Sequence, residues 1–234
     1  MGFTLNYGAL LSGRRAIVSG DALGIGREVA ALFKSCGAGV MRIAGGGDGA
    51  IPADLADARS LGEAFERARN ELGGVDLLVN VAELAAPGGA DGIGADALRA
   101  LMGKSYLCAF RLTRDALPSM IENRRGDIVN ITPDVGAFYG KRGTAAIAAC
   151  AGAIQAFTRC VAMDYIRYHV RANCVHVPMD GLPRKRPLLG APDASDAANA
   201  ALWYACDLSR YVVGDSAFAD GGQRYYARAG GGFA

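Results

Sequence analysis

The sequence has almost no net charge: 25 lysines and arginines stand against 23 aspartates and glutamates, which leaves +2 at pH 7. The basic excess of a nucleic-acid-binding protein is absent, so we expect no nucleic-acid partner. No uninterrupted apolar run approaches the ~18 to 20 residues that a membrane span needs. The start, Met1–Asn6, also lacks the basic segment and apolar stretch of a signal peptide. We therefore expect a cytoplasmic protein with no membrane association.

Zinc-site spacing is missing as well. The six cysteines are scattered, no two of them form a Cys-x-x-Cys pair, and the chain has only two histidines. We expect no metal site, and we interpret the cysteines as buried free thiols in a reducing compartment. They are Cys36, Cys108, Cys150, Cys160, Cys174 and Cys206.

The chain is rich in apolar residues, at 51%, and contains 33 glycines. This composition can fill one sizeable core and excludes disorder. Short apolar runs alternate with stretches of helical period, without a linker or repeat, which predicts βαβ units. We expect one α/β domain over residues 1–234, a doubly wound Rossmann-type parallel sheet with helices on both faces. The expected strands are 15–19, 40–43, 75–79, 127–131, 170–175 and 216–219, and the expected helices are 25–36, 61–72, 98–117, 145–168 and 194–206.

A glycine-rich turn, Ser19–Gly26, joins the first expected strand to the first helix. Such glycines let a backbone approach a diphosphate at a helix N-terminus, although a tight turn and close helix packing explain them equally well. The turn closely resembles that of the short-chain dehydrogenase/reductase (SDR) family, and the resemblance extends over about residues 12–222. Further landmarks are Asp54–Asp57, Asn80–Ala82, Gly126–Ile131, Arg171–Val175 and Asp220–Gly222. The resemblance implies hydride transfer with a nicotinamide cofactor, using a tyrosine, a lysine, a serine and an asparagine.

All four of these catalytic positions carry other residues. The family segment aligns without a gap on Ala145–Ala153, which places Ile147 at the tyrosine and Ala151 at the lysine. The serine position falls on Pro133 and the asparagine position on Ser105. Ile147 and Ala151 can neither transfer a proton nor hold a charge. We therefore predict no catalytic residue at these positions.

The cofactor positions are also changed. The acidic residue that would hold a ribose falls on Ala44 or Gly45, and Asp21 places a negative charge where a diphosphate would lie. Glu83 adds a second carboxylate, while Asp54, which would contact adenine, is kept. The segment that closes over substrate in the family is short here, at Pro178–Gly190. We predict no cofactor in this chain.

These losses suggest a non-catalytic subunit that pairs with an active SDR paralogue. The expected complex is a heterotetramer with the activity of an NAD-dependent hydroxyacyl-CoA-type dehydrogenase, with NAD bound in the active partner. Two helices, 98–117 and 145–168, would form the contact. The basic cluster Arg184–Arg186 would meet CoA phosphates or form a solvated loop, and the tail Gln223–Ala234 would reach a neighbour or fray.

Two further hypotheses remain open. The first is a non-redox enzyme, an isomerase, dehydratase or cyclase, with a new site at the carboxyl ends of the strands. Its candidate residues are Ser105, Thr132, Asp134, Tyr139 and His176. The second is a binding module that senses a ligand in the former cofactor groove. A reductase with Tyr139 and Lys141 as a relocated pair is disfavoured, because a spacing of two separates them on a strand or a helix.

Overall fold

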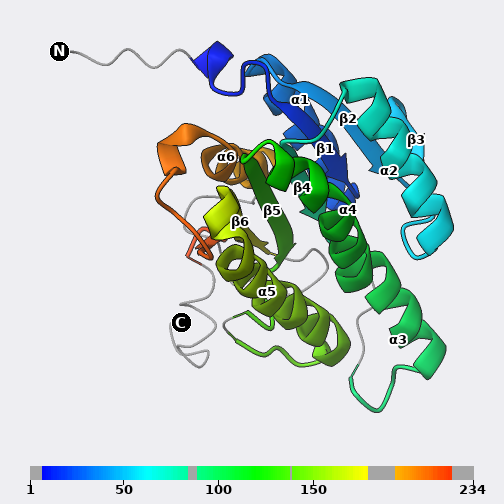
Figure 1. Cartoon of the computed structure of the whole chain (residues 1–234). Helices are drawn as coiled ribbons and strands as arrows, with labels where there is room; N and C mark the ends of the chain where they lie inside the picture. The colour runs from blue at the N-terminus through cyan, green and yellow to red at the C-terminus, as the bar shows by residue number, and fades with distance from the viewer. Residues whose placement is uncertain (1–6, 84–88, 138, 179–192, 223–234) are drawn as a thin grey trace.

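The computed structural model describes residues 7–83, 89–137, 139–178 and 193–222. Within them lies one seven-stranded sheet in the order β3-β2-β1-β4-β5-β6-β7, with every pairing parallel. The strands are β1 Arg15–Ser19, β2 Gly39–Ala44, β3 Ala50–Pro52, β4 Leu77–Val81, β5 Gly126–Pro133, β6 Val170–Val177 and β7 Ser216–Phe218. The predicted single sheet is confirmed, and helices surround it (Figure 1).

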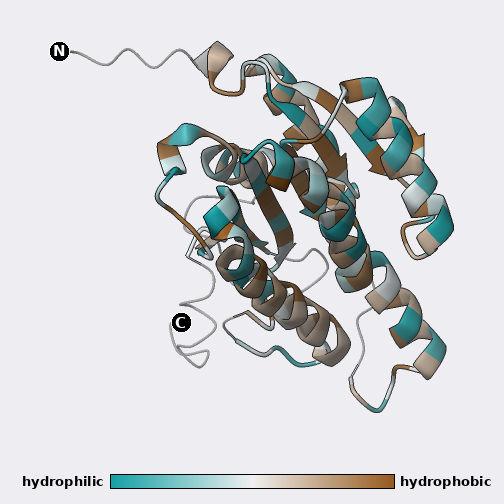
Figure 2. Ribbon diagram, in the orientation of Figure 1, coloured by the Kyte–Doolittle hydropathy of each residue, from teal (hydrophilic) through white to brown (hydrophobic). Residues whose placement is uncertain are grey.

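Helices cover both faces of the sheet. The longer ones are α1 Ile25–Ser35, α2 Ala58–Leu72, α3 Ala95–Met102, α4 Cys108–Glu122, α5 Ala145–Tyr165 and α6 Ala194–Ala205. The helices α1 and α6 pack on one face, and α2, α4 and α5 pack on the other. Alternate strand residues therefore enter different cores: Val18 lies in the first core and Ile17 in the second. The visible central strands carry brown, hydrophobic stretches in Figure 2, as expected for a sheet covered on both faces.

Three expected boundaries were wrong for physical reasons. The strand β3 was missed because it has only three residues and ends in Pro52, which has no N–H to donate. The helix expected at 98–117 is three segments, in which a π-helical turn, η3 Gly103–Leu107, joins α3 to α4. Gly103 explains this turn's position, because a Cβ there would lie 2.9 Å from the Cβ of Ala56. The strand expected at 75–79 begins two residues later.

The helix α5 continues through a 3-10 turn, η4 Ile166–Tyr168, and this segment is long and apolar enough to cross a membrane by length and composition. The segment was not expected from the sequence, because polar residues such as Arg159 and Asp164 interrupt its apolar run. Half of the most apolar window is buried. Residues such as Ile154 and Val161 pack in the interior, and α5 contacts β5 and β6. Its apolar character therefore follows from packing against the sheet.

The cysteines behave largely as expected. All six are free thiols, and five are buried, whereas Cys160 is exposed on α5. Burial raises the pKa of the Cys108 thiol to about 12, with a further contribution from Glu83. A thiol with so high a pKa is unreactive at neutral pH. The expectation of buried thiols is wrong only for Cys160.

Candidate functional site

The carboxyl ends of the strands meet at one edge of the sheet, where a buried row of hydrogen bonds crosses three strands. The Ser19 hydroxyl donates to the Asn80 amide oxygen at 3.0 Å. The amide nitrogen of Asn80 donates to Asn130 at 2.8 Å, and that of Asn130 donates to Thr158 of α5 at 2.8 Å. The row exists because Ser19, Asn80 and Asn130 are in register across β1, β4 and β5. It gives the edge a rigid polar floor, which the sequence analysis missed.

The positions of the four lost catalytic groups lie together beside this edge. Ile147 and Ala151 are completely buried on α5, in an apolar cluster that also contains Ala82 and Val135. The hydroxyl of Ser105, in the π-helical turn, donates to the Leu101 carbonyl at 2.6 Å. The side chains of Ile147 and Ala151 have no group that can carry a proton or a charge, and their neighbours in this cluster are apolar as well.

Two of the candidate residues form a pair just beyond β5. The Tyr139 hydroxyl donates to Oδ2 of Asp134 at 2.9 Å, and Asp134 is 1% exposed. Burial raises the pKa of Asp134, although the bond from Tyr139 opposes this, and the negative charge of Asp220 adds to the rise. Burial and the Asp134 carboxylate also raise the pKa of Tyr139. The positive charge of Lys141 also acts on Asp134 and lowers its pKa. Tyr139 and Lys141, which are two residues apart in the sequence, therefore both act on the same carboxylate.

Two of the remaining three candidates, Thr132 and His176, lie on the neighbouring strands β5 and β6. His176 is in register with Thr132, and its ring packs on Phe218 with 4.6 Å between the centroids. Its Nε2 is 3.4 Å from the amide nitrogen of Gln155 on α5. Both His176 and Thr132 are buried. The structure therefore joins Tyr139 to Asp134 by a hydrogen bond, whereas His176 lies near Gln155 and Ser105 donates to the Leu101 carbonyl.

The glycine-rich turn leads into α1 through a 3-10 turn, η2 Ala22–Gly24, and several backbone N–H groups here already have partners. The backbone N–H of Arg27 donates to Oδ1 of Asp21 at 2.9 Å. The backbone N–H of Asp21 donates to the Glu83 carboxylate at 3.1 Å, and that of Gly24 donates to the Asp21 carbonyl at 3.0 Å. Two carboxylates thus occupy the positions at which a bound anion would accept hydrogen bonds.

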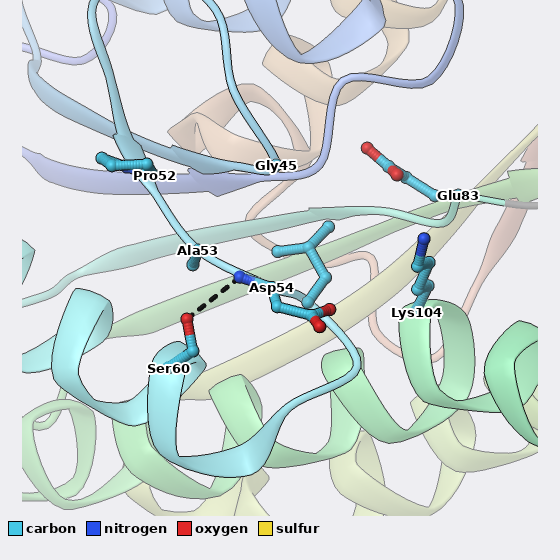
Figure 3. A pocket seen from close by; sticks show the side chains of 8 residues that line it. Gly45, Pro52, Ala53, Asp54, Ser60, Glu83 and Lys104 are labelled. Atoms are coloured by element: carbon cyan, nitrogen blue, oxygen red, sulfur yellow. Dashed lines mark hydrogen bonds between the residues drawn. The ribbon is translucent and has the colours of Figure 1, made fainter.

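A polar pocket of about 460 Å³ opens beside this turn, at the carboxyl ends of β2, β3 and β4 (Figure 3). Asp54 and Glu83 contribute carboxylates, and the amino group of Lys104, from the π-helical turn, points toward Glu83. The Ser60 hydroxyl accepts the backbone N–H of Asp54 at 3.0 Å. The pocket suits a polar small molecule. Within the described residues, no three His, Cys, Asp or Glu side chains gather closely enough to hold a metal.

A dinucleotide of the kind that the resemblance implies would need its diphosphate at the glycine-rich turn. Asp21 and Glu83 already accept the N–H groups of Arg27 and Asp21 there. A diphosphate would face like charge and find these donors taken, so the turn in this arrangement does not fit the group. The expected basic cluster Arg184–Arg186, most of the segment Pro178–Gly190 and the tail Gln223–Ala234 lie outside the described residues.

Comparison with known proteins gives relatives along almost the whole chain. It is 27% identical over 242 residues, 91% of this chain and 96% of the relative, to 2,5-dichloro-2,5-cyclohexadiene-1,4-diol dehydrogenase LinX of Sphingobium indicum. It is 30% identical over 229 residues, 88% of this chain and 95% of the relative, to 3-oxoacyl-[acyl-carrier-protein] reductase of Bos taurus. A solved structure from Burkholderia xenovorans, described as of the short-chain dehydrogenase/reductase kind, has a TM-score of 0.82, 26% identity and 92% and 98% coverage.

These relatives contradict the hypothesis of a non-catalytic subunit, because they are named as a dehydrogenase and a reductase. They equally contradict the alternative of a non-redox enzyme. A narrower resemblance, to the inactive subunit of the 2-[hydroxy(phenyl)methyl]succinyl-CoA dehydrogenase of anaerobic toluene degradation, has no support in them. The sequence analysis had named Tyr139 and Asp134 only as candidates for a non-redox site, and the structure joins them by a hydrogen bond at the same edge.

The expected paralogue partner, the heterotetramer and the cytoplasmic location remain predictions. The model of the short chain dehydrogenase family matches residues 14–180, well over half of the 234 residues. The chain belongs to the short chain dehydrogenase family.

Proposed function

We propose that the protein interconverts a hydroxyl group and a carbonyl group on a small organic molecule. In this proposal Tyr139 and Asp134 donate and accept the proton that the reaction transfers. The observation that carries the proposal is the 2.9 Å hydrogen bond between these two side chains at the carboxyl edge of the sheet. Reduction of a carbonyl adds a hydride at carbon and a proton at oxygen. Ile147 and Ala151 cannot supply that proton, whereas a phenol can.

The surroundings of the pair fit a proton donor. A raised pKa keeps Tyr139 protonated at neutral pH, so its hydroxyl can donate to the alkoxide that forms on the substrate oxygen. Donation leaves a phenolate beside Asp134, which costs energy by like charge. The raised pKa of Asp134 lets its carboxylate take a proton from solvent and pass it along the hydrogen bond to the phenolate, which restores the phenol and leaves Asp134 ionised again. The pair can therefore supply the proton that carbonyl reduction needs.

The names of the relatives suggest which substrates to try first. They include a cyclohexadienediol dehydrogenase and a 3-oxoacyl reductase. We therefore propose cyclic ketones and diones, cyclic diols and 3-oxoacyl thioesters as the initial panel. Hydride donors should include NADH, NADPH and the phosphate-free 1-benzyl-1,4-dihydronicotinamide, because the turn at Asp21 does not fit a diphosphate in this arrangement.

The test is steady-state reduction of the panel by wild type and by Tyr139→Phe, which removes only the hydroxyl. We expect kcat of the variant to fall by about 100-fold or more, in the range of general acid catalysis. Tyr211→Phe is the matched control, because Tyr211 is 97% exposed, and its rate should equal that of wild type. Full activity of Tyr139→Phe would refute the role of the pair, and a panel with no turnover by wild type would count against the function.

A further inference from the structure

We propose that Asp21 is a specificity-determining residue: its carboxylate takes the place of an anionic ligand and closes the glycine-rich turn to phosphate groups. The inference concerns binding and goes beyond the proposed reaction. It rests on the contacts of Asp21 with the first turn of α1 and with β2.

The Asp21 carboxylate makes the contacts that a bound phosphate would make at a helix N-terminus. Its Oδ1 accepts the backbone N–H of Arg27 at 2.9 Å. Its Oδ2 lies 3.0 Å from Nε of Arg27 and 3.1 Å from Nη2 of Arg42. One carboxylate thus meets both a helix amide and two guanidinium groups. An N-terminal amide and paired cations are the usual elements of a phosphate site.

A second observation points to an anion at this place. Arg42 is 6% exposed, and its Nη1 donates to the Asp48 carbonyl at 3.1 Å. Within the described residues its Nε makes no hydrogen bond, and its Nη2 has only the ion-pair contact with Oδ2 of Asp21, which lacks the geometry of a hydrogen bond. The ion pair with Asp21 is thus the contact that balances this charge. A buried guanidinium with spare donors would bind an anion if Asp21 lost its charge.

The glycines of the turn are not evidence that a phosphate binds there, because close packing of the chain is enough to require them. A Cβ on Gly20 would lie 2.2 Å from the Val81 carbonyl oxygen, and one on Gly26 would lie 2.0 Å from the Gly20 carbonyl oxygen. Glu83 adds a second carboxylate on the Asp21 N–H. The turn needs its glycines to form at all, whether or not a ligand binds.

The consequence for ligand choice follows from charge. A phosphate entering the turn would meet two carboxylates and would have to displace Asp21 from both arginines, so the wild-type groove should reject diphosphates. The adjacent pocket of about 460 Å³, with Asp54, Glu83 and Lys104 in its lining, remains available. The groove therefore takes a polar small molecule that carries no phosphate at the turn.

The test measures binding of ADP and of inorganic pyrophosphate by calorimetry at low and moderate salt. Asp21→Asn removes the charge at constant shape, and we expect it to bind ADP about tenfold to a hundredfold more tightly than wild type. Glu28→Gln is the matched control, since it removes a carboxylate from the first turn of α1, the helix that the Asp21 turn leads into. This control should bind ADP as weakly as wild type.

A double variant and a folding check complete the design. Asp21→Asn combined with Arg42→Met should lose the gained affinity, because the buried cation is gone. Circular dichroism of each variant confirms folding, and Asp21→Ser replaces Asp21→Asn if that variant unfolds. Equal ADP affinity in wild type and the Asp21 variant, whether tight or weak, would overturn the proposal. Since no turnover is measured, this outcome is separate from failure of the proposed reaction.

Discussion

Two aspartates in this molecule each lie between two arginines, at opposite edges of the sheet. At the amino ends of the strands, Asp127 is 2.6 Å from Arg14 and 2.6 Å from Arg171. At the carboxyl ends, Asp21 pairs with Arg27 and Arg42 at 3.0 and 3.1 Å. The composition of the two clusters is the same, but their surroundings differ.

The Asp127 cluster is enclosed, and its donors reach backbone carbonyls. Arg14 donates to the Asp76 carbonyl at 3.0 Å, and Arg171 donates to the carbonyls of Tyr204 at 2.8 Å and Ser209 at 2.6 Å. These bonds tie β1, β5 and β6 to the end of α6. A cluster that is bonded in this way to backbone from several elements acts as a structural link.

The Asp21 cluster is more open. The Arg27 side chain is 63% exposed and that of Asp21 is 16% exposed. Its carboxylate faces a helix N-terminus next to a pocket, where a ligand can compete with it. The comparison teaches that burial, and the identity of the remaining hydrogen-bond partners, decide whether such a cluster stabilises the fold or controls access to a site.

The largest effect should come from Asp127→Asn. This change leaves Arg14 and Arg171 buried without a counter-charge, and loss of one partner from a buried ion pair costs about 3–5 kcal/mol. Urea unfolding of the variant and wild type measures the difference. Glu63→Gln, in an exposed pair with Arg59, should leave the urea midpoint unchanged. An Asp127 variant as stable as wild type would remove the distinction between the two clusters.

A smaller effect is expected from Asp21→Asn on the free energy of unfolding. The amide still accepts the Arg27 N–H, and Arg27 is exposed, but the buried Arg42 loses its counter-charge, so the cost should be about 1–3 kcal/mol. The same urea experiment, repeated at higher salt, should show a smaller difference because salt screens the exposed arginine. A loss comparable with that of Asp127→Asn would mean that Asp21 is a structural link as well.

The smallest effect concerns Asp134, a buried carboxylate with a tyrosine as its hydrogen-bond partner. Burial raises the folded-state pKa of Asp134 above the usual value of an aspartate. Its stabilising contribution is therefore complete below the unfolded-state pKa and is lost as pH rises through the folded-state pKa. Asp134→Asn has no such loss, so its Tm relative to wild type should rise between about pH 4 and pH 7.

The control for this experiment is Asp96→Asn, whose side chain is 98% exposed in the native protein. Its Tm difference from wild type should stay nearly constant over the same pH range. A relative Tm of Asp134→Asn that falls as pH rises would show that the folded protein favours the ionised carboxyl, and would count against its part in proton transfer.

Much of the fold was predictable from local patterns. Helix α2 repeats apolar residues such as Leu61, Phe65 and Ala68 on one face, and β4 is a continuous buried run. The exact ends of the helices and strands were harder to predict, because packing against segments distant in the sequence decides where each one ends. Contact between Gly103 and Ala56, for example, brings together residues far apart in the chain.

The candidate site was predictable in part. Matches on both sides of positions 147 and 151 allowed their alignment, so the missing tyrosine and lysine could be found from sequence. The contact between Asp21 and Arg42 could not be predicted from the sequence, because it depends on the pairing of Val18 with Arg42 in the sheet. The sequence named Tyr139 and Asp134 as candidates but not the bond between them, because the conformation of the loop after β5 decides which side chain the Tyr139 hydroxyl reaches.

The two outermost strands of the sheet have a consequence for how the molecule behaves at high concentration. Both described edge strands, β3 and β7, are three residues long, and β3 ends in a proline. Short edges offer few unpaired N–H and C=O groups, and proline offers no donor, so another chain finds little to extend. The fold is thereby protected against strand-to-strand aggregation, and copies that associate would do so through their helices.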